Sequence, residues 1–373
     1  MKFLFFGDLC ITESNSEKFA SGNGNEVFSD SIINLFRSCD FSCINLESPL
    51  ISSESKPIKK CGPILGAKRE CSKGLSYLKP DLVCLANNHI NDYGYNGLIT
   101  TIDELDKNKI NYVGSIVDGG EKPYFVNGDV AILNCCEKEF SFNPKDNSGA
   151  FCFSDNVFKI LKKLYSEGKT IIVVFHGGTE NFDYPSPKLV ELCHSFVDFG
   201  ATLVLCQHSH RIGCLESYKS SKIVYGQGNF LFDEYSKSDK WTQSLGVIYD
   251  SSSNNVEYVV SSFKDGKVSL IEDSVSVLDE VKARSEKIIS KKYMDEYSRF
   301  SKQKYLKLLC KLRGYSKIRT GIEVLIFKGF FVKLHYLGKK KHVLYDLLNC
   351  EAQRELINTN LEDEVFDKTK NEN

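Results

Sequence analysis

Acidic, amide and imidazole side chains occur directly after several apolar segments of this chain. Carboxylate and amide oxygens combined with imidazole nitrogens suit zinc, manganese or iron. A glutamate can bridge two ions, and two metals about 3.5–4 Å apart can activate water and bind both the attacking and the leaving oxygen. The pattern predicts a hydrolytic centre that holds two divalent metal ions (Mn, Fe or Zn). The candidate metal ligands are Asp8, Glu47, Asn88, His176, His208 and His210.

Each candidate ligand also has a structural explanation. Asp8 could cap a turn, Glu47 could cap a local backbone group, and Asn88 could be a turn residue. Four of the seven histidines nevertheless follow apolar segments, and His-x-His lets two rings reach one site from a turn. The agreement of five separate segments favours the metal-binding interpretation.

The apolar segments themselves predict a layered α/β fold. Continuous apolar strands that alternate with helical patterns indicate a sheet covered on both faces. In such sheets, ligand sites form at the carboxyl ends of the strands. Strands are expected at residues 2–6, 42–45, 81–86, 131–136, 170–175, 201–206 and 223–225, and helices at residues 27–37, 94–107 and 188–199.

After residue 243 the pattern changes. Residues 245–250, 256–263 and 267–271 alternate between apolar and polar positions, which predicts antiparallel strands that complete a second sheet. Two sheets flanked by helices make a four-layer α/β/β/α sandwich. We expect this domain to span residues 1–274.

The last hundred residues have a helical period and many Lys and Glu residues. Helices are expected over 281–292, 293–312, 318–335 and 343–356 within a helical extension of residues 275–361. The charged residues 362–373 are expected to be disordered. Residues 314–342 mix apolar and basic residues, which fits either an amphipathic helix on an anionic membrane surface or a helix packed on protein.

Composition limits the partners and the compartment. The 373 residues carry a formal net charge of -1, so nothing draws the whole chain toward nucleic acid. The 14 cysteines include no Cys-x-x-Cys pair, which is typical of a reducing cytoplasm. The first apolar segment ends at Gly7 and Asp8, too early for an export signal. A cytoplasmic protein, membrane-associated if the C-terminal helices bind lipid, is expected.

Six sequence blocks together resemble one protein family. On the strength of these blocks, residues 5–233 resemble the bacterial capsule-synthesis proteins (CapA/PgsA-like, linked to poly-γ-glutamate). That family is a divergent branch of the calcineurin-like metallophosphoesterases. The blocks are Gly7-Asp8, Asn45-Leu46-Glu47, residues 86–94 (Ala-Asn-Asn-His-Ile-Asn-Asp-Tyr-Gly), residues 176–180 (His-Gly-Gly-Thr-Glu), His208-Ser209-His210 and residues 225–230 (Tyr-Gly-Gln-Gly-Asn-Phe).

The resemblance implies a role for each candidate ligand. Asp8 and His210 would bind the first metal, and Glu47 would bridge the two ions. The second metal would be bound by Asn88, His176 and His208.

The resemblance also implies three catalytic residues. His89 would act as a general acid or as a hydrogen-bond donor to a developing oxyanion. Asp92 would orient His89, and Glu180 would lie in the pocket as a substrate contact or a supporting residue.

Three positions depart from the metallophosphoesterase pattern. Cys10 stands where a metal-binding histidine is usual, and we expect a buried thiol there rather than a thiolate ligand. Gln207 replaces a glycine before His-x-His, and Thr202 replaces an acidic residue. These departures bear on catalysis more than on the fold.

The resemblance implies a metal-dependent, phosphoesterase-like hydrolase linked to capsule or other cell-surface polymer biosynthesis. Two alternatives stay open. One is a non-catalytic accessory protein that binds the polymer, its precursor or a membrane synthase. The other is a metal-dependent amidase that acts on γ-glutamyl polymer.

Overall fold

The structure is a computed structural model that describes residues 1–232, 239–288, 290–313 and 350–366. The chain forms two compact units, and each is described by itself. The first consists of Met1–Ile58 and Pro63–Glu286, and the second contains Lys59–Gly62 and the chain from Lys287.

The first sheet of the first unit is built around its N-terminal strand. Strand β1 (Lys2–Leu9) pairs in parallel with β2 and β17 and antiparallel with β18. The strand order is β20-β19-β18-β1-β2-β5-β6, with β17 pairing to β1 at its end. The other strands are β2 (Phe41–Leu46), β5 (Leu82–Cys84), β6 (Asn111–Val113), β17 (Asn229–Leu231), β18 (Gln243–Asp250), β19 (Asn255–Lys264) and β20 (Lys267–Leu270).

Strands β18–β20 correct one expectation from the sequence. They are antiparallel, as predicted, but they complete the sheet that contains β1 instead of a second sheet. The reason lies in the register, which sets Phe5 opposite Val247 and Phe3 opposite Tyr249. These apolar side chains then share one buried face.

The second sheet faces the first. Its order is β15-β16-β14-β13-β10-β9, with β10, β13, β14 and β16 mutually parallel and an antiparallel strand at each edge. Phe5 of the first sheet and Ile172 and Leu205 of the second belong to one buried core between the sheets. The strands are β9 (Tyr124–Asn127), β10 (Val130–Cys136), β13 (Thr170–His176), β14 (Ala201–Gln207), β15 (Leu215–Tyr218) and β16 (Ser221–Val224).

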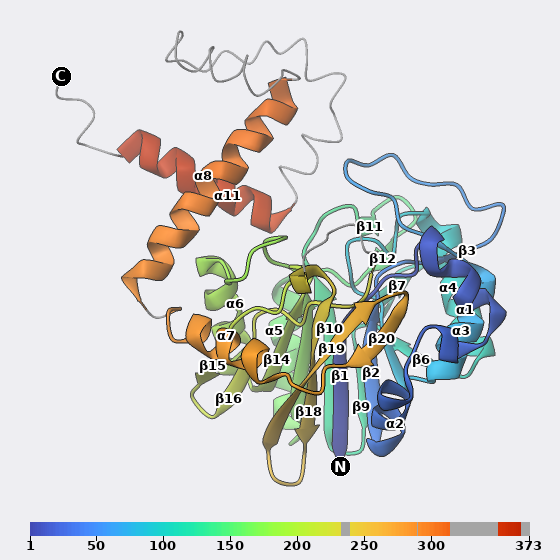
Figure 1. The fold of residues 1–373 in the computed structure, drawn as a ribbon. Helices are drawn as coiled ribbons and strands as arrows, with labels where there is room; N and C mark the ends of the chain where they lie inside the picture. The colour runs from blue at the N-terminus through green and yellow to red at the C-terminus, as the bar shows by residue number, and fades with distance from the viewer. Residues whose placement is uncertain (233–238, 289, 314–349, 367–373) are drawn as a thin grey trace. The chain divides into compact units, whose positions relative to one another are not determined.

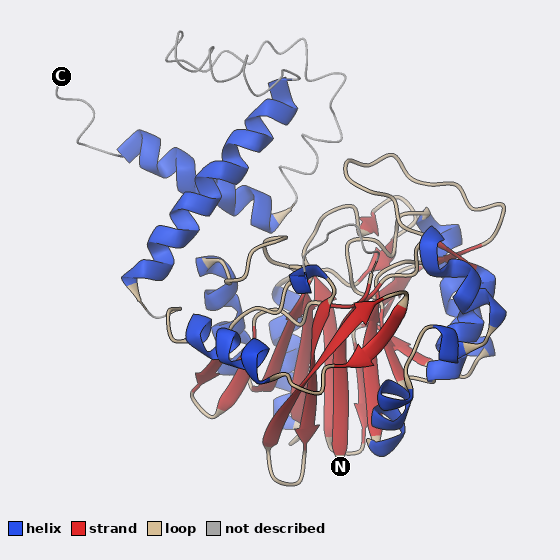
Figure 2. Ribbon diagram, in the orientation of Figure 1, coloured by secondary structure: helices blue, strands red, loops and turns tan. Residues whose placement is uncertain are grey.

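Helices cover the outer face of each sheet (Figures 1 and 2). Phe36, Leu75 and Leu98 from helices on the first sheet belong with Phe6 of β1 to one buried apolar cluster. On the second sheet α6 packs on β14. The predicted α/β/β/α fold class is therefore confirmed. The helices are α1 (Glu13–Ser21), α2 (Asp30–Ser38), α3 (Ser72–Leu78) and α4 (Gly94–Lys107) on the first sheet, and α5 (Asp155–Ser166) and α6 (Pro187–Asp198) on the second.

Smaller elements occupy the connections, and the sequence did not predict them because they are too short to show a period. A four-stranded sheet has the order β11-β12-β7-β8, and β3 pairs with β4. These elements are β3 (Leu50–Ile51), β4 (Ala67–Lys68), β7 (Ser115–Val117), β8 (Gly120–Lys122), β11 (Phe142–Asn143), β12 (Ser148–Ala150), η1 (Gly24–Glu26), η2 (Arg69–Cys71) and η3 (Asp239–Trp241).

Helix α7 (Val275–Ser285) belongs to the first unit, although the sequence suggested that an extension begins at residue 275. Its Val281 is buried in the core between the two sheets. The expected helix 281–292 is wrong in its bounds, because α7 ends at Ser285 and α8 begins at Lys291.

The second unit contains α8 (Lys291–Arg313) and α11 (Glu351–Phe366), which contact each other. The Asn360 amide donates a hydrogen bond of 2.7 Å to Ser301 Oγ. The expected disorder of residues 362–366 is wrong, because α11 includes them.

Other expectations lie outside the described residues. These are the tail at 367–373, the helix at 318–335, the amphipathic segment 314–342 and all but the last seven residues of the helix expected at 343–356. In the described part of the chain, no helix has both the length and the apolar character needed to cross a bilayer.

Candidate metal centre

All six predicted metal ligands meet at one place in the first unit. The parallel strands of both sheets end there, which is why residues far apart in sequence converge. Every one of the six is buried, with at most 7% of its surface exposed. Asp8 is near the end of β1, Glu47 follows β2, Asn88 lies after β5, His176 ends β13, and His208 and His210 follow β14.

One group of candidate ligands consists of Asp8, Glu47 and His210. Ligand atoms from these three residues all lie within 4.8 Å of one another. Asp8 Oδ2 is 3.6 Å from His210 Nδ1, and Glu47 Oε1 is 4.0 Å from His210 Nε2. Two fully buried carboxylates and an imidazole form a donor set that suits a divalent cation.

The orientation of His210 is set by Asn229. The Asn229 side-chain amide donates to the Trp241 carbonyl at 2.9 Å, so its oxygen is the atom left to face the ring. That oxygen lies 2.9 Å from His210 Nδ1. Nδ1 therefore carries the hydrogen and Nε2 faces Glu47. Metal-binding histidines are usually held in this way by an acceptor on the other ring nitrogen.

A second group consists of Asn88, His176 and His208. His176 Nε2 lies 3.0 Å from Asn88 Oδ1 and 3.2 Å from His208 Nδ1. Atoms bound about 2.1 Å from one ion lie roughly 3.0–3.4 Å apart, so this spacing fits a shared cation. Glu47 Oε1 is 4.0 Å from His176 Nε2 as well as from His210 Nε2, which places this carboxylate between the groups.

A third histidine, His89, also lies near the Glu47 carboxylate. Its Nδ1 lies 2.7 Å from Asp92 Oδ2, and that oxygen also accepts from the Leu65 backbone N–H at 2.8 Å. Its Nε2 is 4.0 Å from Glu47 Oε1. The predicted contact between Asp92 and His89 is present, and it turns the second ring nitrogen toward the cluster.

Glu180 is placed differently. It is exposed, on the loop that follows β13, and it is not among the residues that define the two groups. The same loop reaches the His-x-His turn through a hydrogen bond from the Asn181 backbone N–H to the Ser209 carbonyl at 2.8 Å. A substrate contact by Glu180 stays a prediction.

The His-x-His turn has an unusual backbone. His208 has φ 82° and His210 has φ 55°, the left-handed region that residues other than glycine seldom occupy. Such conformations persist where the surroundings hold them, and they cluster at functional sites. Gln207, which replaces the expected glycine, is buried, and its amide donates to Gln227 Oε1 at 3.1 Å.

Burial controls the charge of the cluster. It raises the pKa of Asp8 above its ordinary value, although His210, the Asn45 amide and the His208 backbone N–H oppose this rise. Burial also lowers the pKa of His176 well below its ordinary value, with further lowering by the neighbouring histidines. Neutral imidazole is the form that binds metals. The buried Asp8 carboxylate thus lies 3.6 Å from a ring, His176, whose charged form is disfavoured, and a bound cation would stabilise the carboxylate charge.

Cys10 is fully buried just beyond β1, as expected of a structural thiol. Its backbone N–H donates to the Leu231 carbonyl at 2.8 Å. Among the described residues, the set of mutually close ligand atoms contains Asp8, Glu47 and His210 but not Cys10.

Two asparagines of the site were not predicted to act there. The Asn45 amide donates to Asp8 Oδ1 at 2.9 Å, and its oxygen accepts from the Asn87 amide at 3.0 Å. Asn229 orients His210, as described above. Both stand in the quoted sequence blocks. Asn45 lies two residues before the predicted ligand Glu47, which was an available signal, whereas Asn229 is distant in sequence from His210 and no local pattern pointed to it.

The fold and this site define a four-layer α/β protein with a buried cluster of carboxylates and imidazoles where parallel strands end. Residues 2–234, more than half of the chain, match the family model described as "Bacterial capsule synthesis protein PGA_cap". The chain belongs to this family.

Curated relatives carry names from surface-polymer production. The chain is 27% identical over 215 residues to the "Capsule biosynthesis protein CapA" of Bacillus anthracis, covering 53% of this chain and 52% of the relative. It is 27% identical over 241 residues to the "PGA biosynthesis protein CapA" of Bacillus subtilis, covering 62% and 63%. A "Probable polyglutamine synthesis accessory protein" of Mycobacterium tuberculosis is 28% identical over 179 residues, covering 43% and 47%. The chain thus spans between about half and under two thirds of the length of these relatives.

Solved structures give weaker likenesses. TT1561 of Thermus thermophilus aligns with 69% of this chain and 97% of its own, at 12% identity and a TM-score of 0.38. Vps29 of Entamoeba histolytica complexed with zinc aligns with 61% and 95%, at 9% identity and a TM-score of 0.27.

Proposed function

We propose that this protein is a metal-dependent hydrolase of the phosphoesterase type that acts in the production of a cell-surface polymer. One observation carries the proposal. The buried oxygen Oε1 of Glu47 lies 4.0 Å from a ring nitrogen of each of His89, His176 and His210. A buried carboxylate with several imidazoles around it is a donor set that suits a centre of two divalent metal ions.

The two groups of ligands would each hold one divalent ion. Asp8 and His210 would hold the first and Asn88, His176 and His208 the second, with Glu47 shared between them. When bound, the metals would supply Lewis-acid activation of water and neutralise negative charge on the substrate.

The chain's own residues contribute proton transfer and positioning. Asp92 holds His89 by its Nδ1, so Nε2 is directed toward the cluster. In its protonated form this nitrogen can donate to a leaving or developing oxyanion. His89 and Asp92 are both buried, which strengthens their electrostatic interactions by excluding water.

The substrate class follows from the family and the site. The names of the relatives refer to capsule biosynthesis, PGA biosynthesis and polyglutamine synthesis. We therefore propose a surface polymer or its precursor as substrate and a membrane synthase as partner.

The test compares metal content and hydrolysis in matched histidine variants. His208→Ala removes a proposed ligand, whereas His194→Ala removes a histidine outside the site, where its Nε2 lies 3.0 Å from Glu216. Elemental analysis should find metal in the wild type and in His194→Ala but far less in His208→Ala. Hydrolysis of an aryl phosphate with the metal found should fall far below the wild-type rate in His208→Ala alone. A fully metallated wild type that hydrolyses neither phosphomonoesters, phosphodiesters nor γ-glutamyl amides would refute the hydrolase.

A second candidate function is a non-catalytic accessory role. Two observations favour it: the buried Cys10 at a position where a histidine ligand is usual, and the name of the mycobacterial relative. Co-purification with a membrane synthase should then survive Asp8→Asn. Loss of that association together with loss of metal would tie partner binding to the metal centre instead.

A further inference from the structure

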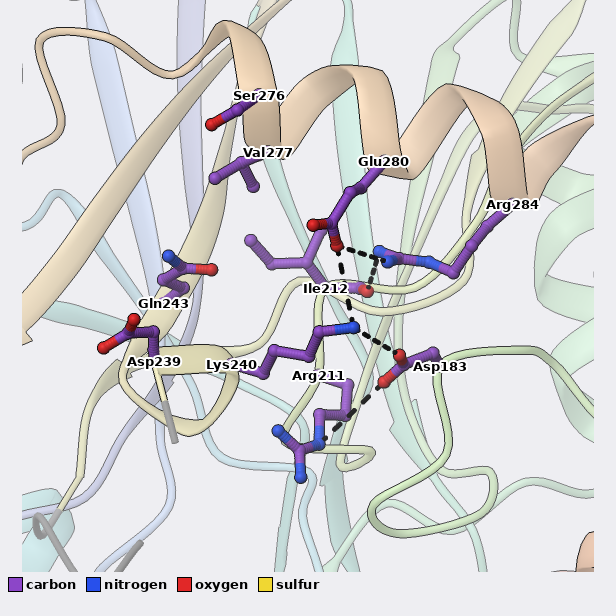
Figure 3. Close-up of a pocket in the computed structure, with 10 residues that line it drawn as sticks. All are labelled: Asp183, Arg211, Ile212, Asp239, Lys240, Gln243, Ser276, Val277, Glu280 and Arg284. Atoms are coloured by element: carbon purple, nitrogen blue, oxygen red, sulfur yellow. Dashed lines mark hydrogen bonds and ion pairs between the residues drawn. The ribbon is translucent and has the colours of Figure 1, made fainter. Parts of the chain in front are cut away.

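A pocket with a volume of about 370 Å³ lies in the first unit beside the candidate metal centre (Figure 3). Arg211, which lines it, directly follows His210 in the chain. Lys240, which also lines it, directly precedes Trp241, whose ring centroid is 4.9 Å from that of His210. Two chain segments thus connect the pocket wall to one proposed ligand.

Three acidic residues line the pocket, Asp183, Asp239 and Glu280, and two of them, Asp183 and Glu280, lie close to a basic side chain. Lys240 Nζ lies 3.1 Å from Asp183 Oδ2 and 3.6 Å from Glu280 Oε2. Glu280 also lies 3.7 Å from Arg284 Nη1. Figure 3 shows these side chains reaching into one space from separate segments, with Glu280 and Arg284 extending from α7.

The two arginines of the pocket have N–H donors that the other described residues do not use. Arg211 Nε and Nη1 and Arg284 Nε are buried and, within the described residues, have no hydrogen-bond acceptor. The distance from Arg211 Nε to Asp183 Oδ1 is 4.0 Å, too long for a hydrogen bond. Buried donors without acceptors cost free energy. Because Nε–H and the Nη1–H groups of one guanidinium point in different directions, an oxyanion could accept from either of these Arg211 donors but not from both at once.

We propose that this pocket binds an oxyanion of the substrate, a carboxylate or a phosphate, and that Arg211 is its principal donor. The proposal rests on the function proposed above and adds a specificity site to it. The reacting bond would lie at the metal centre while a second anionic group is held here. The volume lies within the range of pockets that bind small ligands. Substrates with only one anionic group would therefore bind less well.

The test measures binding of two probes, inorganic phosphate and succinate, to the full chain by calorimetry. The measurement is made with a chelator present, so that the metal centre does not contribute. Arg211→Gln should weaken binding of at least one probe tenfold or more, and Arg211→Lys should weaken it less. The preferred probe tells a phosphate site from a carboxylate site.

A variant that is expected to strengthen anion binding distinguishes loss of the site from misfolding of the protein. Glu280 is largely exposed, and Glu280→Gln removes a negative charge 3.6 Å from Lys240 and 3.7 Å from Arg284. Anion affinity should rise about two- to fivefold, a gain that a misfolded protein would not show. Unchanged binding in both Arg211→Gln and Glu280→Gln would overturn the proposal.

The Asp8→Asn variant distinguishes the failure of the anion-pocket proposal from the failure of the hydrolase proposal. It should abolish metal binding but leave probe binding in the chelator unchanged. Probe binding that depends on Asp8 and not on Arg211 would assign the anion to the metal centre and overturn the pocket. An inactive wild type with Arg211-dependent binding would instead count against the hydrolase and support an anion site.

Discussion

The amide oxygen of Asn229 accepts a hydrogen bond from Nδ1 of His210 at 2.9 Å and so decides which ring nitrogen faces Glu47. Asn229 lies opposite Asp8 in the register of β17 and β1. The pairing of β1 is irregular at this point, with a register shift between Asp8 and Leu9. Strand irregularities of this kind re-aim side chains next to functional sites. One strand contact thus positions both a proposed ligand and the residue that orients another.

Removing the Asn229 amide should weaken metal binding. Asn229→Leu leaves His210 Nδ1 without its acceptor, and partners of this kind are typically worth 10–100-fold in metal affinity. We expect metal affinity, measured by calorimetry with Mn²⁺ and Zn²⁺, to fall by about that factor. Asn111→Ala is the control, since this exposed asparagine donates to the Asp81 carbonyl. Wild-type affinity in Asn229→Leu would show that the contact does not position a ligand.

Changing Asp92 should affect turnover and spare metal binding. In Asp92→Asn the amide oxygen can still accept from Leu65 N–H and from His89 Nδ1, because one oxygen makes both contacts, but the carboxylate charge beside the His89 ring is lost. Without that charge the ring would transfer a proton less effectively, and kcat should fall about 10²–10⁴-fold. Metal content should remain at the wild-type level. The matched control is Asp118→Asn, at an aspartate that accepts from the Tyr95 hydroxyl. A similar fall in both variants would argue against a specific role for Asp92.

The protonation of Glu104 should make the free energy of unfolding depend on pH. It is 3% exposed, and it accepts from Arg69 Nη2 at 2.6 Å and from Ser72 Oγ at 2.9 Å. Burial acts to raise its pKa, but the hydrogen bonds from Arg69 and Ser72 and the charge of Lys107 outweigh burial and leave the pKa below its ordinary value. A lowered pKa in the folded state gives stability that is full above the unfolded value of about 4.3 and is lost as pH falls below it.

The Glu104→Gln variant checks this coupling. The free energy of unfolding at pH 7, from urea denaturation, should fall by about 1–2 kcal/mol, because Arg69 is half exposed and solvent weakens the ion pair. The loss of stability between about pH 5 and pH 3 should become shallower than in the wild type. Glu17→Gln, at an exposed pair with Lys68, should behave like the wild type. An unchanged pH profile in Glu104→Gln would contradict the assignment.

Gly7 should tolerate no side chain. A Cβ atom there would overlap the Gly228 carbonyl oxygen and lie 3.0 Å from the Gln227 side chain. Gly7→Ala must therefore push β1 away from β17 and displace Asp8 and Asn229. We expect a loss of about 1–3 kcal/mol in unfolding free energy together with lower metal content. Gly120→Ala, in the short strand β8, is the comparison, since its Cβ would meet Val117 O at 3.1 Å. Full metal content in a folded Gly7→Ala protein would exclude this constraint.

The sequence predicted much of the fold because burial and period are local properties. The segment expected to be helical at 94–107 coincides with α4, Gly94–Lys107. The segment expected at 170–175 became β13, Thr170–His176. The membership of β18 in the first sheet was not predictable in this way. Alternation shows that a strand has two faces, but the choice of partner strand depends on which edge of β1 is open.

For the site, the sequence by itself identified the chemistry: acids, amides and imidazoles placed just after apolar strands. Side-chain identity and strand direction were enough to expect Asp8, Glu47 and His210 at one edge. Only the tertiary structure decided that Asn229 sets the ring of His210, that Glu180 is exposed, and that Arg211 lines a pocket with α7. These outcomes depend on contacts between segments distant in sequence, whose distances and angles no local pattern of residues specifies.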